Sequence, residues 1–586
     1  MVKFRNFPVL GMVIPIIIWS CNGSATTEET SSLDAGGQHA AEATLYYGGD
    51  IITMEGDSAQ YAEALVVKDG RILFVGSKEE AGKAAGDGTR SVDLKGQTML
   101  PGFIDAHGHL WMSGIQAVAA NLLPAPDGTG NDIATLIANT NEWKAKNADV
   151  IDKTGWIVGF GYDEAQLKEN RHPTAADLDK VSKDTPVLFL HQSGHLAAVN
   201  SKGLEMSGIS AATPDPKGGV IQRVKGTQNP SGVLEETAVF AAAASLLSKV
   251  DDKGNEALIV AGQRAYSRFG FTTAQEGRAT SVVCEAYKRM SDAGSLIMDV
   301  YAYPDIQMGL EYMKTNGVQA AYKNHFRVAG VKLSLDGSPS GKTAWLTKPY
   351  KVPPKGMPKS YKGYPAVPDM AVLNNLVGEA FKNNWQIITH CNGDAAADAY
   401  IKAVRLAADQ YGNNNRRTVM IHAQTVREDQ LDSMKVLGII PSFFSMHTYY
   451  WGDWHRDETL GKERAYRISP TVSTLNRDMI FTQHHDAPVA FPDALRVLHS
   501  TVNRVSRSGD VIGLDQRVTP YIALKSITAW AAWQAFEEKE KGTLAAGKLA
   551  DFVILDKNPL KIDPMTITDI SINATIKEGK TIYSKQ

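Results

Sequence analysis

The sequence contains Leu100-Pro101-Gly102-Phe103-Ile104-Asp105-Ala106-His107-Gly108-His109, an apolar run that ends in His-x-His. Side chains of a strand alternate between its two faces, so a strand here would project both imidazoles on the same side. Two nitrogen donors at the carboxyl end of a strand suit a divalent metal in the mouth of a (β/α)8 barrel. An isolated His-x-His is more often structural or superficial, so its interpretation depends on the rest of the chain.

Other apolar runs in the middle of the chain end in side chains of similar chemistry, or contain them. They are 328–333 with Lys332, 387–390 with His390, 419–422 with His422, and 479–482 followed by Asp486. Buried strands that alternate with helical stretches indicate a parallel sheet, and the span 101–534 suits a (β/α)8 TIM barrel. The stretch of about 115–260 is long for one barrel unit and predicts an insertion.

The two ends of the chain, 43–100 and 535–586, are rich in short strand-like runs separated by glycine. Gly48-Gly49-Asp50, Lys68-Asp69-Gly70 and Glu578-Gly579-Lys580 are predicted to form turns between them. Each end has few strands and would be marginal alone. We therefore expect an α/β fold in which both ends pair into one small composite β-sandwich beside the barrel.

Composition excludes several functional classes. The 586 residues carry a net charge of −3, which gives no basic surface for nucleic acid. The three cysteines form no CxxC pair, so a thiolate zinc cluster and a disulfide framework are not expected. A metal in this chain would be held by His, Asp, Glu or a modified Lys.

The N-terminus predicts an export signal. Lys3 and Arg5 precede an apolar run at 9–19 that is too short for a membrane span. Ile18-Trp19-Ser20-Cys21 resembles a bacterial lipobox, in which the cysteine is acylated. We expect a signal peptide over 1–21, a flexible tether over 22–42, and an exported protein held on the bacterial cell envelope only through lipid on Cys21. Ordinary signal cleavage, with an incidental cysteine, is the alternative.

Two of the candidate residues have simpler interpretations when taken alone. Asp486 could ligate a metal and accept a proton from water, but an Asp after a strand is commonly a cap or turn residue. Lys332 could be carboxylated by CO2 to bridge two metals. An ordinary buried ion pair is the simpler interpretation of its position.

The chain resembles the amidohydrolase superfamily, in the amidohydrolase-3 branch that includes N-substituted formamide deformylases. The resemblance covers about 44–584. Besides the stretch 100–109 and the four candidate runs, it rests on residues 156–164, 195–201, 232–235, 270–273 and 542–552. Two departures concern the pocket: His484 and His485 precede Asp486, where the family commonly has a small residue. Gln192-Ser193-Gly194 precedes His195, where an acidic residue is frequent.

The resemblance implies specific roles. His107 and His109 would bind one metal with the help of Asp486. His390 and His422 would bind a second metal or complete a single site, and Lys332 matches the position of a carboxylated bridging lysine. His195 would contact substrate or have a structural role.

These roles predict a metal-dependent hydrolase that cleaves an amide or N-acyl C–N bond with metal-activated water and Asp486 as the base. Zinc, one or two ions per chain, is the default metal, with Mn and Fe as alternatives. Aromatic residues of the later loops, Trp345 among them, would either line a pocket for an apolar or aromatic part of a small-molecule substrate or pack together. Hydrolytic deamination of a heterocycle and a non-catalytic surface binding role remain alternatives, and a homodimer is one expected assembly.

Overall fold

The computed structural model describes residues 43–585. The predicted signal peptide, Cys21 and the tether lie outside these residues. Within the described part of the chain, no helix combines the length and the apolar character needed to cross a bilayer.

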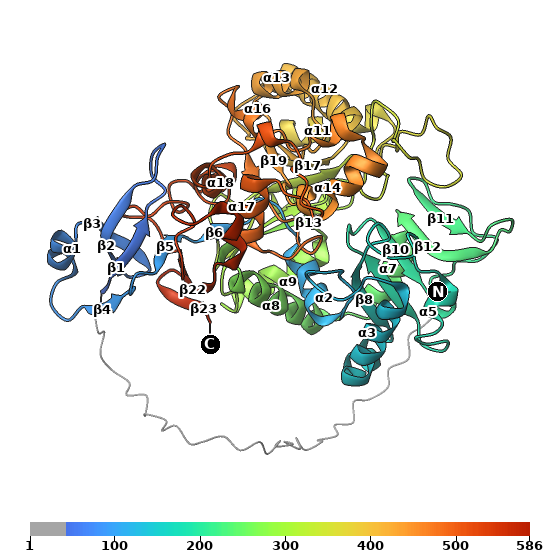
Figure 1. Cartoon of the computed structure of the whole chain (residues 1–586), viewed down its shortest axis with the longest axis horizontal. Coiled ribbons are helices and arrows are strands. Elements are labelled where there is room, and N and C mark those ends of the chain that lie inside the picture. The colour runs from blue at the N-terminus through green and yellow to red at the C-terminus, as the bar shows by residue number, and fades with distance from the viewer. Residues whose placement is uncertain (1–42, 586) are drawn as a thin grey trace, which may run out of the picture. The chain divides into compact units, whose positions relative to one another are not determined.

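Both ends of the chain contribute to one eight-stranded sheet with the order β23-β22-β21-β5-β1-β2-β3, in which β4 also pairs with β1 (Figure 1). Its strands are β1 (Thr44–Ile52), β2 (Tyr61–Lys68), β3 (Arg71–Gly76), β4 (Arg90–Asp93), β5 (Thr98–Pro101), β21 (Phe552–Leu555), β22 (Ile572–Lys577) and β23 (Lys580–Ser584). The ends meet where β5 runs antiparallel to β21, with Leu100 opposite Val553. This pairing of the ends agrees with the sequence prediction, whereas a two-layer sandwich stays a prediction.

The predicted hairpin turn at Gly48-Gly49-Asp50 is wrong. β1 runs through these residues, and its register against β2 shifts between Tyr47 and Ile51. A Cβ on Gly49 would lie 2.1 Å from the Gln97 carbonyl oxygen, so the chain passes too close to its neighbour for any side chain. Glycine at this point permits a bulge in a continuous strand, as it would permit a turn.

The chain between these two ends forms two parallel sheets, in the orders β15-β14-β13-β6 and β16-β17-β18-β19-β20. Their strands are β6 (Phe103–Ile104), β13 (Phe271–Ala279), β14 (Asp299–Pro304), β15 (Phe326–Val328), β16 (Gly330–Ser334), β17 (Gln386–Cys391), β18 (Val419–His422), β19 (Ile440–Phe443) and β20 (Thr482–Gln483). A bridge between Asp305 and Lys332 links β14 to β16. The predicted strand at 328–333 is split at Ala329, and the one at 479–482 begins only at Thr482.

Residues 120–236 form a separate six-stranded sheet with the order β11-β12-β10-β9-β8-β7, inside the range predicted for an insertion. Its strands are β7 (Ala120–Asn121), β8 (Ile157–Tyr162), β9 (Val187–His191), β10 (Leu196–Val199), β11 (Gly219–Arg223) and β12 (Pro230–Glu236).

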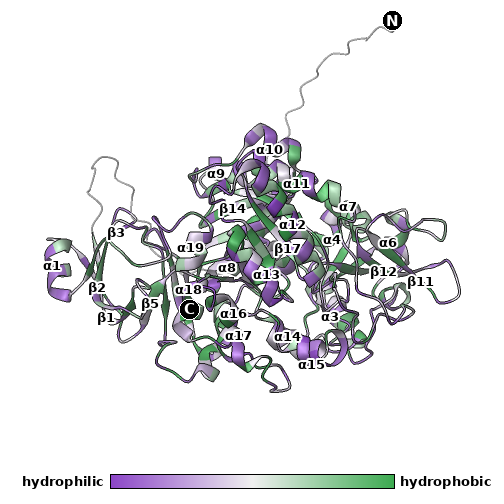
Figure 2. Ribbon diagram, turned by 90° about the horizontal axis from the view of Figure 1, so that it is seen from above, coloured by the Kyte–Doolittle hydropathy of each residue, from purple (hydrophilic) through white to green (hydrophobic). Residues whose placement is uncertain are grey.

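Helices connect many of the strands. They are α1 (Lys78–Ala85), α2 (Leu110–Val118), α3 (Ile133–Lys146), α4 (Ala148–Thr154), α5 (Ala175–Leu178), α6 (Ser201–Met206), α7 (Val239–Leu247), α8 (Asp252–Arg268), α9 (Ser281–Asp292), α10 (Leu310–Asn316), α11 (Met370–Lys382), α12 (Asp394–Tyr411), α13 (Glu428–Leu437), α14 (His447–Trp454), α15 (Lys462–Ala465), α16 (Thr471–Leu475), α17 (Ala494–Asn503), α18 (Pro520–Ser526) and α19 (Ala529–Gln534), with a π-helix at His455–Thr459 and 3₁₀ turns at Leu514–Gln516 and Pro564–Asp569. α12 shows why they form: Ala396, Tyr400, Ala403 and Ala407 recur every three or four residues and are buried. Figure 2 shows the same division, with hydrophobic central strands such as β17 and a hydrophilic surface on helices such as α13.

Candidate metal centre

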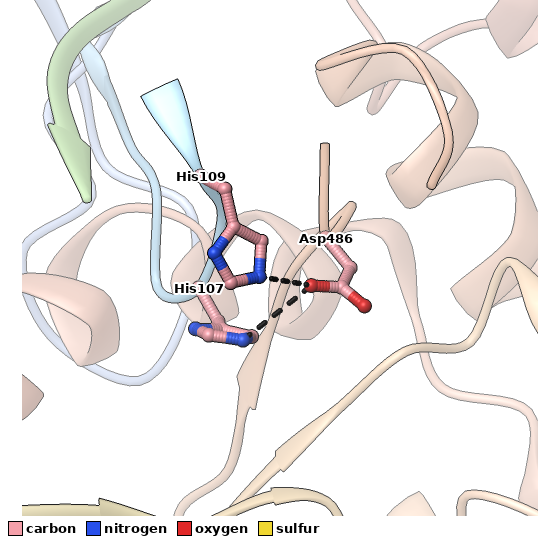
Figure 3. A group of neighbouring side chains, drawn as sticks. All are labelled: His107, His109 and Asp486. Carbon is pink, nitrogen blue, oxygen red and sulfur yellow. Dashed lines mark ion pairs between the residues drawn. The ribbon is translucent and has the colours of Figure 1, made fainter. Parts of the chain in front are cut away.

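The six predicted ligand side chains meet at the carboxyl ends of the parallel strands. The nearest Asp486 oxygen, Oδ1, lies 3.4 Å from His107 Nε2 and 3.3 Å from His109 Nε2 (Figure 3). The other Asp486 oxygen lies 3.7 Å from His422 Nε2. His107 and His109 follow β6, His422 ends β18, and Asp486 lies in the turn after β20.

Lys332 and His390 complete the group. Lys332 Nζ lies 2.9 Å from His107 Nε2, and the ring centroids of His390 and His422 are 4.5 Å apart. Lys332, His107 and His422 are at most 2 % exposed. Residues separated by almost 400 positions in the sequence therefore form one cluster.

The backbone is strained at two of these residues. His422 has φ +68° and Asp486 has φ +53°. Both angles lie in the left-handed region, which residues other than glycine seldom adopt. The Asp486 N–H donates to the His107 carbonyl oxygen at 3.2 Å, which ties the turn after β20 to the His-x-His segment. Strain of this kind persists where the surrounding structure holds it, and it often accompanies a functional site.

The cluster has the properties of a metal site. Within residues 43–585, His422 Nε2 and Asp486 Oδ1, which both face the cluster, are buried without a hydrogen-bond partner. Leaving such atoms unpaired costs about 1–3 kcal/mol each, which a bound cation would offset. Burial holds the pKa values of His107, His390 and His422 well below their usual range, so their rings are neutral and offer lone pairs. Nitrogen and carboxylate donors fit a divalent metal such as zinc.

Lys332 has an unusual electrostatic environment for a lysine. Burial lowers its pKa to about 7, against the opposing effect of the Asp486 charge. A large fraction of the amine is then unprotonated and nucleophilic at neutral pH. That state is the one that can react with CO2, as the resemblance implied.

Two further residues contact the candidate ligands from behind. Gln275 Oε1 lies 2.7 Å from His107 Nδ1, while the Gln275 amide donates to the Ala106 carbonyl oxygen at 2.8 Å. His107 Nδ1–H therefore donates to Gln275 and leaves Nε2 directed at the cluster. Asp336 Oδ1 lies 3.3 Å from His390 Nδ1, within ion-pair distance but without hydrogen-bond geometry.

Sequence reasoning did not identify Gln275 or Asp336. Gln275 lies within β13 and Asp336 follows β16, and strands paired with these two lead to predicted ligands, which is the one signal that could have suggested them. Their partners lie 168 and 54 residues away in sequence, so the pairing depends on the tertiary fold.

His195, predicted to contact substrate, lies beside the cluster. Its ring is 5.1 Å from the His390 ring, and its Nδ1 is 2.8 Å from Glu236 Oε2. Burial opposes protonation of His195, but the Glu236 carboxylate outweighs it and raises the pKa of His195. Glu236 is a second neighbour that the sequence did not reveal.

The aromatic residues of the later loops divide between the two predicted roles, lining a pocket and packing together. The Trp345 backbone N–H donates to Asp336 Oδ2 at 3.0 Å, which places this half-buried residue next to the site. Phe444 and Trp451 are buried, and Trp451 Nε1 donates to Asp163 of the inserted sheet. Packing between elements is therefore the role of at least these two residues.

Two other groups of potential ligands in the described residues are already satisfied. Asp163 accepts from Trp451 Nε1, Gln166 Nε2 and the Ala165 N–H, and its neighbour Glu164 pairs with His191 at 2.7 Å. The third group centres on Asp299, which binds two lysine ammonium groups. Neither resembles a vacant cation site, so the His107 cluster is the candidate metal centre.

The amidohydrolase family model matches residues 90–583. The chain belongs to the amidohydrolase family. It is 27% identical to YtcJ of Bacillus subtilis (strain 168), over 92% of this chain and 99% of YtcJ. It is 24% identical to the N-substituted formamide deformylase of Arthrobacter pascens, over 89% of this chain and 95% of the relative.

A crystal structure of an uncharacterized metal-dependent hydrolase from Pyrococcus horikoshii shares the fold. Its TM-score is 0.71 at 24% identity, covering 89% of this chain and 99% of the other. The family assignment supports hydrolase activity with a divalent metal, and the group His107, His109 and Asp486 provides ligands for it.

Proposed function

We propose that this amidohydrolase cleaves an amide or N-acyl C–N bond of a small molecule with water. The observation that carries the proposal is the convergence of His107, His109 and Asp486 with Lys332, His390 and His422, several of them with unpaired buried atoms. In the same proposal, the two parallel sheets close into a (β/α)8 barrel and the eight-stranded sheet folds into the composite sandwich.

Asp486 would be the base in this reaction. A divalent metal held by the cluster would supply a Lewis acid that makes water more acidic and polarises the substrate carbonyl. Asp486 would accept a proton from the attacking water, and then deliver it to the nitrogen that leaves as the C–N bond breaks. The products are a carboxylate and an amine. His195, hydrogen-bonded to Glu236 and beside His390, would contact the substrate.

The substrate class is proposed from the relative that is a formamide deformylase by name. The test is a panel of N-formyl, N-acyl and heterocyclic amine substrates supplied to zinc-loaded protein, with separate detection of amines and ammonia. Release of an amine from an N-acyl compound supports the proposal. Ammonia from a heterocycle would favour a deaminase, and binding without turnover would favour a surface binding protein.

Lys332→Ala tests the proposed carboxylated lysine. We expect metal content per chain to fall and activity to be lost, with partial rescue of both by short carboxylic acids that occupy the space of the missing carbamate. Elemental analysis with and without added acetate measures this. Unchanged metal content and activity would leave Lys332 with a structural role only.

We also propose that the protein is exported and anchored on the bacterial cell envelope through lipid on Cys21, the lipobox cysteine of the sequence. We expect Cys21→Ser to move the protein from the membrane fraction to the soluble fraction after cell fractionation. Continued membrane attachment of this variant would contradict a lipid anchor. A homodimer is proposed as the assembly, which sedimentation can test.

A further inference from the structure

The two ring nitrogens of His422 face different partners. Nε2 lies 3.7 Å from Asp486 Oδ2, inside the metal centre. Nδ1 lies 3.2 Å from His484 Nε2, and His484 Nδ1 in turn lies 2.9 Å from Ser442 Oγ. His422, His484 and Ser442 thus form a line of polar groups that leads away from the centre.

The nitrogen that faces the metal determines which nitrogen of each ring along this line carries a proton. A metal ligand must offer the lone pair of its coordinating nitrogen, so His422 must carry its single proton on Nδ1 if Nε2 faces the metal. That proton is donated to His484 Nε2, which must then be unprotonated. The proton of His484 is left on Nδ1 and is donated to Ser442 Oγ. The opposite arrangement would place a proton on His422 Nε2 and block it.

The surroundings of His484 keep its ring in place. The ring is 1% exposed, and the Phe444 ring stacks on it at 5.5 Å with an angle of 21° between the planes. Ser442 is on β19, directly opposite Thr482 of β20, so adjacent strands fix the spacing between Ser442 and His484.

We propose that His484 is a positioning residue for the metal ligand His422, whose Nδ1 proton it accepts on its own Nε2. The inference rests on the proposed metal centre. It gives two of the ligands different hydrogen-bond partners: an amide for His107 and an imidazole for His422. Carboxylates, backbone carbonyls and water are the usual partners of metal-bound histidine, so the imidazole is a distinctive feature of this site.

The test compares His484→Leu with His484→Gln in metal-free mature protein. Leu retains apolar volume but removes the acceptor, whereas the Gln side-chain oxygen can reach the place of Nε2. We expect the Zn²⁺ dissociation constant, measured by competition with a chelator, to rise about 10- to 100-fold in His484→Leu and to stay near wild type in His484→Gln. The spectrum of the Co²⁺-loaded protein should change in the Leu variant and be preserved in the Gln variant.

Ser442→Ala provides an independent measurement if His484→Leu does not fold. Ser442 acts only through His484, so its substitution should weaken Zn²⁺ binding in the wild-type background. An unchanged Zn²⁺ affinity of Ser442→Ala would contradict the proposed line of donors. Wild-type Zn²⁺ affinity in His484→Leu, or equal losses in the Leu and Gln variants, would overturn the positioning role. A wild-type protein that binds no metal would instead overturn the proposed function.

Discussion

Asp486→Asn should leave the protein folded and lower kcat by about 10²- to 10⁴-fold, the usual contribution of a general base. Asn has almost the same shape as Asp, so the turn after β20 and its hydrogen bond to the His107 carbonyl can persist. It cannot accept the proton of the attacking water. Steady-state kinetics on the substrate found in the panel, with a thermal melt of each protein, measures both parts of this prediction.

Metal content decides how that result is interpreted, because Asp486 Oδ1 also lies within 3.4 Å of both histidines of the His-x-His pair. Activity should stay low after the variant is loaded with zinc to the wild-type level. Nearly normal kcat in the loaded variant would remove Asp486 from the role of base.

Asp299→Ala should lower the free energy of unfolding by about 3–5 kcal/mol, the range for removing one partner of a buried ion pair. Asp299, on β14, is 2% exposed and accepts from both Lys541 and Lys577, the latter at 2.8 Å. Burial opposes its ionisation, but the two lysines outweigh burial and hold the pKa of Asp299 well below its usual range. Without this carboxylate, two buried ammonium groups lose a shared partner.

Chemical denaturation of wild type and Asp299→Ala measures the difference. Asp292→Ala is the matched control, because Asp292 pairs with Lys323 on the surface, where ion pairs contribute little to stability. A wild-type denaturation midpoint for Asp299→Ala would contradict the idea that this carboxylate joins the C-terminal segment to the parallel sheets.

The sequence predicted the residues of the candidate metal cluster better than their surroundings. His107, His390, His422 and Lys332 were identifiable because each lies in or at the end of an apolar run, a pattern that is local. Gln275, Asp336 and His484 contact these candidate ligands, and Glu236 contacts His195, between distant segments that no local pattern joins. The two adjacent histidines before Asp486 were noticed as unusual, but their contacts could not be inferred.

The fold shows the same limit. Parallel strands were predicted from apolar runs, yet their ends depend on neighbours: β20 pairs only through Thr482 and Gln483, which shortened the predicted run at its start. Gly48-Gly49-Asp50 suits a hairpin or a bulge equally well by propensity. Gly49 passes close to the Gln97 carbonyl, and this contact favours the bulge. The contact exists only in the folded sheet.

Metal content per chain, measured by elemental analysis of purified mature protein, is the most direct check on the proposed hydrolase. The six converging side chains predict one or two equivalents of a divalent metal, mainly zinc. They also predict that a chelator abolishes hydrolysis and that added zinc restores it. A protein that contains no metal, and stays inert toward the substrate panel after zinc is added, would contradict the assignment of this cluster as a catalytic metal centre.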